Sequence, residues 1–249
     1  MIYDITPHRI SHIAFIFITL LLSAMSFQRT DVYKNNFSLW MDVVKKSLVK
    51  ARPHNNLGRI YGEMKMWEQA IKEARTALSL NPDYAFAHST LAHIYMEKGL
   101  LDGAEMELKQ TIHLFAMQQF HFEKLHRALG FVYIKKGLIE DATKEFNKAV
   151  PLVPDHPDAR STIAAFYTNE AWSYNDRGDF PLALLLHNIA VSIDPNYADA
   201  HYGAAMSYEA MGRKEEAISH WLEYLRLAPA DESFRKDAME HLKKLQAQL

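Results

Sequence analysis

The feature that most constrains the fold is a set of small and aromatic residues that returns at regular steps along the chain. The tyrosines alone mark the register, at Tyr61, Tyr95, Tyr133, Tyr174 and Tyr208, with steps of 34, 38, 41 and 34 residues. The excesses of four and seven residues amount to about one and two helical turns, which lengthen a helix without rotating its apolar face. A repeat of this length predicts an all-α stack of helical hairpins.

Small residues recur in the same register and have a packing reason. Gly58 is expected to let two helices cross closely, Ala70 to face that contact from the second helix, and Tyr61 to fill the hairpin interior. Glycines between the paired helices supply the left-handed backbone that ends a helix. They are Gly99, Gly137, Gly178 and Gly212.

The pattern resembles the tetratricopeptide repeat, a 34-residue helix-turn-helix with a Leu-Gly-x2-Tyr block, an alanine in the second helix and a closing proline. The resemblance implies an all-α, right-handed superhelix of about five helical hairpins. The expected array covers residues 51–231, with units at 51–84, 85–118, 123–156, 164–197 and 198–231.

Two units depart from the pattern. Ala116 stands where the second unit should have its proline, so its second helix is expected to run long or to continue with little break into the next unit. In the fourth unit Glu170 and Ala171 replace Leu-Gly, and residues 158–176 are expected to form one elongated helix.

The array needs a polar cap at its end. Residues 232–249 are expected to form a capping helix with one buried face. The residues spaced for that face are Phe234, Ala238, His241, Leu242 and Leu245. Before the array, residues 28–50 are expected to hold a linker and a partial repeat helix over 36–46.

An apolar segment follows a short tail at residues 1–9. Residues 10–27 are eighteen residues without Asp, Glu, Lys or Arg, at the lower edge of what spans a bilayer, and they predict a single-pass membrane anchor. Two alternatives stay open: a cleaved signal peptide, because Ala24-Met25-Ser26 is a small-x-small pattern, and a buried helix that closes the array. Arg9 precedes the segment while Arg29 and Lys34 follow it, so charge does not decide the topology.

The junction after this segment carries a second resemblance. Its residues match the junction of the transmembrane and tetratricopeptide O-mannosyltransferase type, where a membrane helix leads into an Arg-x-His-Asn-Asn-Leu-Gly repeat. The matching residues are Arg29, Leu39, Trp40, Asp42, Arg52, His54, Asn55, Asn56, Leu57 and Gly58. That family's catalytic membrane helices are absent here, so the resemblance implies an extracytoplasmic repeat domain and not glycosyl transfer.

Composition and motifs argue against an enzyme. The formal charge is −2, so no global field draws the chain to nucleic acid, and the absence of cysteine excludes thiolate chemistry and Cys-based metal sites. No P-loop, Gly-x-Ser-x-Gly, His-Glu-x-x-His or glycine-rich nucleotide turn occurs. We therefore predict no catalytic residues, no metal and no cofactor.

Histidines and acidic residues have simpler interpretations. Four histidines take the fourth position of their units, where the family places a large packing residue, and we interpret them as packing residues rather than metal ligands. They are His54, His88, His126 and His201. The acidic residues of the second helices are interpreted as solvated faces. They are Asp102, Glu105, Glu107, Glu215 and Glu216.

Tetratricopeptide arrays present the first helix of each unit to a concave groove, and the resemblance carries the family's groove positions over by register. The first half of this groove is polar and basic, suited to peptide backbone and carboxylates. Its residues are Arg52, Asn55, Asn56, Arg59, Ser89, His93, Lys124 and Arg127. The second half is more aromatic and suited to hot-spot contacts. Its residues are Thr168, Asn169, Trp172, Tyr202, Met206 and Glu209.

These features predict a membrane-tethered scaffold that binds a protein or peptide in its groove, within an envelope assembly, secretion or respiratory complex. The alternative is an accessory subunit of a glycan-modifying membrane enzyme, which the junction resemblance suggests. A carboxylate clamp of the chaperone-docking type is disfavoured, because Asn55 and Ala128 stand where that clamp has basic residues, although Lys124 matches it.

Overall fold

The computed structural model describes residues 36–118, 122–229 and 234–247. Within these residues the chain forms twelve α-helices and one short 3₁₀ helix, with no β-strand. The all-α prediction is therefore confirmed for the described part of the chain. The chain divides into two compact units, with the boundary after Gln118.

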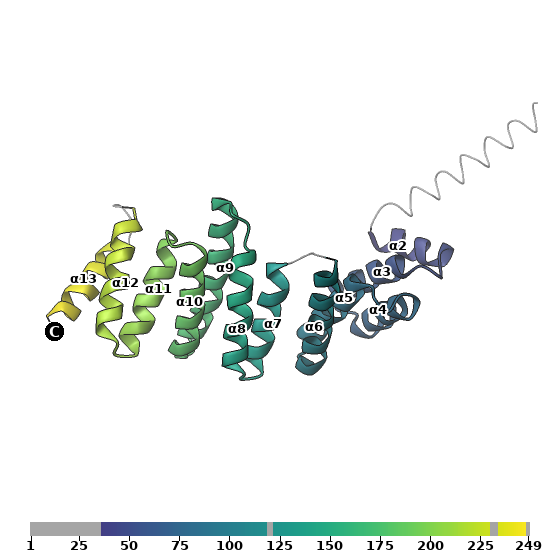
Figure 1. Ribbon diagram of the computed structural model, residues 1–249, viewed down its shortest axis with the longest axis horizontal. Helices are drawn as coiled ribbons and strands as arrows, with labels where there is room; N and C mark the ends of the chain where they lie inside the picture. Colours follow the sequence, from purple (N-terminus) through teal and green to yellow (C-terminus); the bar gives the residue numbers. More distant parts are fainter. Residues whose placement is uncertain (1–35, 119–121, 230–233, 248–249) are drawn as a thin grey trace, which may run out of the picture. The chain divides into compact units, whose positions relative to one another are not determined.

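The first unit holds two helical hairpins behind one single helix (Figure 1). Its elements are α2 (Asn36–Lys46), α3 (Ala51–Glu63), α4 (Trp67–Leu80), α5 (Ala85–Glu97) and α6 (Leu101–Met117). Helix α3 pairs with α4 and α5 with α6, and α2 packs on α3, where the Phe37 and Tyr61 rings meet edge to face at 5.5 Å.

Small residues allow the close helix crossing that the sequence predicts. A Cβ added to Gly58 of α3 would stand 3.1 Å from the carbonyl oxygen of Ala70 and 3.1 Å from the backbone nitrogen of Ala74, both in α4. Ala70 and Ala74 are themselves fully buried. The backbones of α3 and α4 therefore touch at this point, and a larger residue in place of Gly58 would separate them.

The turn inside each hairpin has a residue in the left-handed region. Gly99, Gly137, Gly178 and Gly212 have φ between 70° and 77°, which confirms their predicted role. In the first hairpin the equivalent residue is Lys65, with φ 58°. A side chain with a Cβ is strained in that conformation, so this turn carries backbone strain that the four glycine turns avoid.

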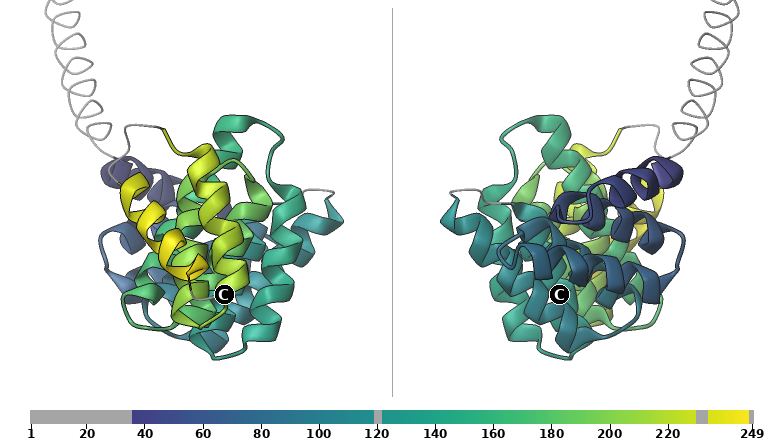
Figure 2. Two further views of the ribbon diagram at one scale, coloured as in Figure 1. Left: turned by 90° about the vertical axis from the view of Figure 1, so that its left-hand side faces the viewer. Right: turned by 90° about the vertical axis from the view of Figure 1, so that its right-hand side faces the viewer.

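The second unit holds three further hairpins and a terminal helix. Its elements are α7 (Glu123–Lys135), α8 (Ile139–Ala149), the 3₁₀ helix η1 (Val150–Leu152), α9 (Pro157–Asn175), α10 (Phe180–Ile193), α11 (Ala198–Ala210), α12 (Lys214–Leu227) and α13 (Phe234–Gln246). Asp179 caps α10 by accepting a hydrogen bond from the backbone N–H of Leu182 at 3.4 Å. Figure 2 shows α13, in yellow, beside α12, and the two helices are in contact.

The two departures from the repeat lengthen helices, as predicted. Helix α6 has 17 residues, against 14 in α4, and α9 has 19, against 13 in α11. Helix α6 ends at Met117 and α7 begins at Glu123, so of the two alternatives predicted for the second unit the structure has the long second helix.

The terminal helix differs from its prediction at one residue. Ala238 and Leu245 are buried and His241 and Leu242 are partly buried, as expected, but Phe234 is 57% exposed. Phe234 is the first residue of α13, and its ring lies 5.6 Å from that of Tyr202 in α11.

The predicted membrane anchor at residues 10–27 lies outside the described residues. Among the helices that the structure describes, none is long and apolar enough to cross a bilayer.

Candidate functional site

The second unit contains a pocket lined mainly by aromatic side chains. Its volume is about 460 Å³, and it is formed by side chains of α9, α11, α12 and α13. The lining residues are Trp172, Asp199, Tyr202, Met206, Tyr224 and Phe234. Three of them, Trp172, Tyr202 and Met206, are predicted groove residues that the fold brings together at one place.

Tyr202 is at the centre of this aromatic pocket. Its ring centroid lies 5.1 Å from that of Tyr224, 5.6 Å from that of Phe234 and 6.0 Å from that of Trp172. The first two contacts are edge to face, the arrangement that the ring quadrupoles favour. The rings of Trp172, Tyr202, Tyr224 and Phe234 therefore line the pocket at different angles to one another.

A hydrogen bond fixes the Tyr202 ring. The Tyr202 hydroxyl donates to Oδ2 of Asp237 in α13 at 2.6 Å. Burial, with the Asp237 carboxylate as a further cause, raises the pKa of the Tyr202 phenol far above its usual value. The hydroxyl therefore stays protonated at physiological pH and keeps α11 and α13 joined at the pocket.

Buried groups behind the pocket fix Trp172 as well. Its ring meets that of His187 in α10 edge to face at 5.4 Å, and the amide nitrogen of Asn175 lies 3.4 Å from His187 Nε2. His187 is fully buried, and burial is the main cause that lowers its pKa to about 3. A neutral imidazole therefore stands behind Trp172, and the indole is positioned before any ligand arrives.

Exposure differs among the lining residues. Tyr224 is buried, Trp172, Tyr202 and Met206 are half-buried, and Asp199 and Phe234 are exposed. The pocket thus has an apolar floor and an open rim that carries one carboxylate. Concave sites with this composition bind small side chains or ligands.

The predicted basic half of the groove is spread over α3, α5 and α7. In α3, Arg52 and Arg59 are exposed, and Arg59 pairs with Glu63 on the same helix. Asn55 is buried, and its side-chain oxygen accepts a hydrogen bond from the Thr90 hydroxyl of α5 at 2.8 Å. Asn55 therefore joins two neighbouring first helices, and its amide oxygen is already occupied.

The remaining basic-half residues have different surroundings. In α5, His93 is exposed and Ser89 half-buried, and in α3 Asn56 is half-buried. In α7, Arg127 forms an ion pair with Glu123, Nε to Oε1 at 2.8 Å, and its guanidinium lies 4.0 Å from the Phe166 ring centroid.

Arg127 is therefore engaged by Glu123 of its own helix and by Phe166 of α9. Burial raises the pKa of Glu123, although the charge of Arg127 opposes the shift. Removing Arg127 would leave Glu123 buried without its cation, so this arginine has a structural role whether or not it contacts a partner. Lys124 on the same helix is exposed, with its ammonium 5.7 Å from the Phe122 ring centroid.

A series of partly buried histidine–glutamate pairs was not predicted from the sequence. Nδ1 of His54, His88 and His126 lies 2.7, 2.6 and 2.7 Å from a carboxylate oxygen of the glutamate 19 residues later. These glutamates are Glu73, Glu107 and Glu145. The constant spacing of 19 residues, present in three units, is the signal that identifies them.

The pairs correct two interpretations. Glu107 is 6% exposed, so its assignment to a solvated face is wrong, whereas Asp102 and Glu215 are exposed as expected. The fourth-position histidines do pack inside their hairpins, as predicted, but each is held there by a hydrogen bond and does not merely fill space. In the last hairpin the pattern changes, because His201 faces His220 with the Nδ1 atoms 3.1 Å apart. Burial and the neighbouring His201 lower the pKa of His220 to about 4.

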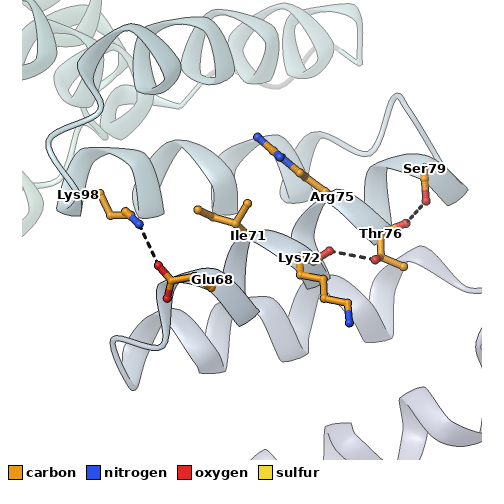
Figure 3. Close-up of a pocket in the computed structure, with 7 residues that line it drawn as sticks. All are labelled: Glu68, Ile71, Lys72, Arg75, Thr76, Ser79 and Lys98. Carbon is orange, nitrogen blue, oxygen red and sulfur yellow. Dashed lines mark hydrogen bonds and ion pairs between the residues drawn. The ribbon is translucent and has the colours of Figure 1, made fainter.

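A second, more open pocket lies over α4. It is lined by three cations and two hydroxyls, with Ile71 and Glu68 (Figure 3). Two of the cations are engaged: Arg75 donates to the Tyr95 hydroxyl at 3.0 Å, and Lys98 pairs with Glu68 at 3.3 Å. The Thr76 and Ser79 hydroxyls donate to carbonyls of their own helix. Most polar groups that line the pocket over α4 are therefore already engaged in contacts within the chain.

In the described parts of the chain, no three His, Asp or Glu side chains come close enough to hold a metal ion. For the chain as a whole, the absence of a metal stays a prediction.

Comparison with known proteins supports the repeat assignment. Two tetratricopeptide-repeat family models match the chain, one over residues 51–84 and the other over residues 168–232. The first range coincides with the first predicted unit, and the second includes the aromatic pocket as far as Tyr224. No protein with a curated description matches the sequence.

Two solved structures resemble the fold. The first is described as YrrB, a TPR protein with an unusual peptide-binding site; it is 21% identical, with a TM-score of 0.52, and the match covers 82% of this chain and 97% of that one. The second is a MamA protein, 20% identical with a TM-score of 0.50, covering 71% of this chain and 90% of that one. At these identities the likeness concerns the fold alone. The O-mannosyltransferase-like junction is not addressed by any of these matches.

Proposed function

We propose that this tetratricopeptide-repeat chain is a non-catalytic scaffold that binds a protein or peptide partner at the aromatic pocket of its second unit. The observation that carries the proposal is the convergence of Trp172, Tyr202 and Met206, from two successive first helices, on one pocket of about 460 Å³. Tryptophan and tyrosine in well-packed pockets dominate the energy of protein interfaces. The description of YrrB as having a peptide-binding site adds a precedent within the same fold.

The preorganisation of the pocket favours binding over a purely structural role. Side chains that must be ordered on association cost about 0.5–1.5 kcal/mol each. Tyr202 and Trp172 are already held by Asp237 and His187, so this cost falls largely on the partner.

Affinity purification from detergent-solubilised membranes tests the proposal. Met206→Glu and, separately, Trp172→Ala are expected to lower capture of a specific partner at least about tenfold relative to the unmodified chain. Leu222→Glu is the matched control, because Leu222 is a 50% exposed residue of α12 outside the pocket. Equal capture by the unmodified chain and both pocket variants would refute the assignment.

The proposal includes a tether at residues 10–27, with the repeats on the extracytoplasmic side, in an envelope assembly, secretion or respiratory complex. Its support is the eighteen-residue run without charged side chains. Extraction of membranes with alkaline carbonate tests the tether: an integral anchor stays in the pellet, and release into the supernatant would contradict it.

A second candidate function is an accessory subunit of a glycan-modifying membrane enzyme. The junction motif from Arg29 to Gly58 favours it, and Trp40 and Asp42 of that motif lie in α2, next to the first hairpin. Co-purification of a polytopic glycosyltransferase would support this candidate, and its absence from a preparation that retains other partners would reject it.

A further inference from the structure

We propose that the aromatic pocket takes a basic side chain, an arginine or lysine of the partner, with Asp199 as its counter-charge. This inference rests on the proposed function and names the chemistry of the bound residue. It is carried by the charge around the pocket and by the orientation of the rings.

Asp199 is the one charged residue among those that line the pocket. It lies in the first turn of α11 and is exposed. Its carboxylate accepts a hydrogen bond from the Tyr197 hydroxyl at 3.4 Å, and among the described residues no lysine or arginine forms an ion pair with it. The rim therefore offers a carboxylate that a ligand cation can neutralise.

Neighbouring charges do not compensate Asp199. In α13, Asp237 accepts the Tyr202 hydroxyl and adds a second negative charge behind the ring. Arg235, also in α13, donates hydrogen bonds to the carbonyl oxygens of Leu225 and Ala228 at 2.5 and 2.9 Å. His241 lies between two carboxylates, with Nδ1 2.8 Å from Glu209 Oε2 and Nε2 3.8 Å from Asp237 Oδ1, and Lys244 pairs with Glu209 at 3.9 Å. These cations face Asp237 and Glu209 rather than Asp199, so the carboxylate at the rim keeps its negative charge.

The rings add a second reason for a cation. The faces of tryptophan and tyrosine attract ammonium and guanidinium groups. Trp172 and Tyr202 are half-buried, tilted at 48° to each other with their centroids 6.0 Å apart, and both line the pocket, so a cation in the pocket lies beside two aromatic rings. The long alkyl stems of arginine and lysine also suit the apolar floor formed by Met206 and Tyr224, while the charged head remains at the rim near Asp199.

An apolar side chain is the competing occupant. It would fill the same floor but leave Asp199 without a partner, so its binding would not depend on that carboxylate. Substitution of Asp199 therefore separates the two occupants. Asp158→Asn is a matched control, because Asp158 is an exposed acid in the first turn of α9 and does not line the pocket.

The test uses the full chain and four peptides, Gly-Ser-Gly-X-Gly-Ser-Gly with arginine, lysine, citrulline or norleucine at X. Binding is followed by NMR at the indole N–H of Trp172, with Trp67 of the first unit as an internal reference. The arginine and lysine peptides are expected to shift the Trp172 signal, with apparent affinities about tenfold above those of citrulline and norleucine. Asp199→Asn is expected to remove most of this preference and Asp158→Asn to keep it.

Equal binding of the norleucine and arginine peptides, or an unchanged preference in Asp199→Asn, would overturn the basic-residue inference while leaving the pocket as a binding site. Failure of all four peptides to move the Trp172 signal would also overturn it. The proposed function is decided separately, because the capture experiment with Met206→Glu and Trp172→Ala requires no assumption about the bound residue.

Discussion

Gly203→Ala tests whether the neutral His187 behind the pocket is as tightly enclosed as the structure shows. A Cβ added to Gly203 in α11 would stand 2.1 Å from Cε1 and 2.3 Å from Nε2 of the His187 ring. His187 has no exposed surface, and its ring is held against Trp172. The imidazole therefore cannot swing into solvent, and α10 and α11 must move apart to admit the methyl group.

Two opposing effects set the change in the free energy of unfolding caused by Gly203→Ala. Replacing a glycine inside a helix by alanine stabilises by about 0.5–1 kcal/mol, because the unfolded chain loses freedom. Overpacking a core costs about 1–3 kcal/mol, and a required displacement of more than an ångström places this site at the upper end. The expected result is a net destabilisation of about 2 kcal/mol. Gly62→Ala is the matched control, because its added Cβ would lie 3.6 Å from Ile94, an ordinary contact; it should stabilise by about 0.5–1 kcal/mol.

Urea denaturation followed by circular dichroism and tryptophan fluorescence measures both changes. Opposite signs for Gly203→Ala and Gly62→Ala are expected. In a His187→Ala background the obstacle is gone, so Gly203→Ala should lose most of its penalty. If Gly203→Ala is as stable as the unmodified chain, or if its penalty persists without the imidazole, the reasoning about His187 is refuted.

Three further predictions concern the turns and the buried titratable groups. Lys65→Gly should stabilise the first unit by about 0.5–1 kcal/mol in urea denaturation, since it relieves the left-handed strain that glycine avoids, whereas Gly99→Ala should destabilise. The pKa of His187 is about 3 in the folded chain against an ordinary value of 6.5, so the stability that its neutral form allows is complete above pH 6.5 and is lost as the pH falls toward 3. The total loss is on the order of 5 kcal/mol, and His187→Gln should flatten the measured pH dependence of the free energy of unfolding. Glu107→Ala should destabilise by about 1.5–3 kcal/mol because it leaves His88 without its acceptor, and a double-mutant cycle with His88→Ala should recover a coupling of similar size; near-additive effects would contradict the pair.

The repeat could be predicted from the sequence because its signal lies in small residues whose packing reason is local. The close approach of Gly58 to Ala70 and Ala74 is of this kind. The His88–Glu107 pair could not be recognised in the same way, because its two residues lie on different helices and each alone has an ordinary explanation. Only the common spacing of 19 residues in three hairpins identifies the partner.

Only some of the residues that line the aromatic pocket could be predicted from the repeat register. Trp172 and Tyr202 follow from the repeat register, since they face the same side of successive first helices. Asp199 occupies the first turn of its helix, and Phe234 was assigned to a buried face of the terminal helix, so neither was expected at the rim. The position of Phe234 depends on how α13 approaches α11, which no local pattern encodes.

Helix α13 takes the place that a first helix would have in a further repeat. Neighbouring first helices are joined by hydrogen bonds between residues 32 to 35 apart, as between Asn55 and Thr90, and the bond from Tyr202 to Asp237 spans 35 residues in the same way. A terminal helix is needed to cover the apolar face of the last hairpin, and here it also supplies Phe234 to the pocket and fixes Tyr202. Completion of the site is thus coupled to docking of α13. Any change that loosens this helix should therefore weaken binding at the pocket even where no pocket residue is replaced.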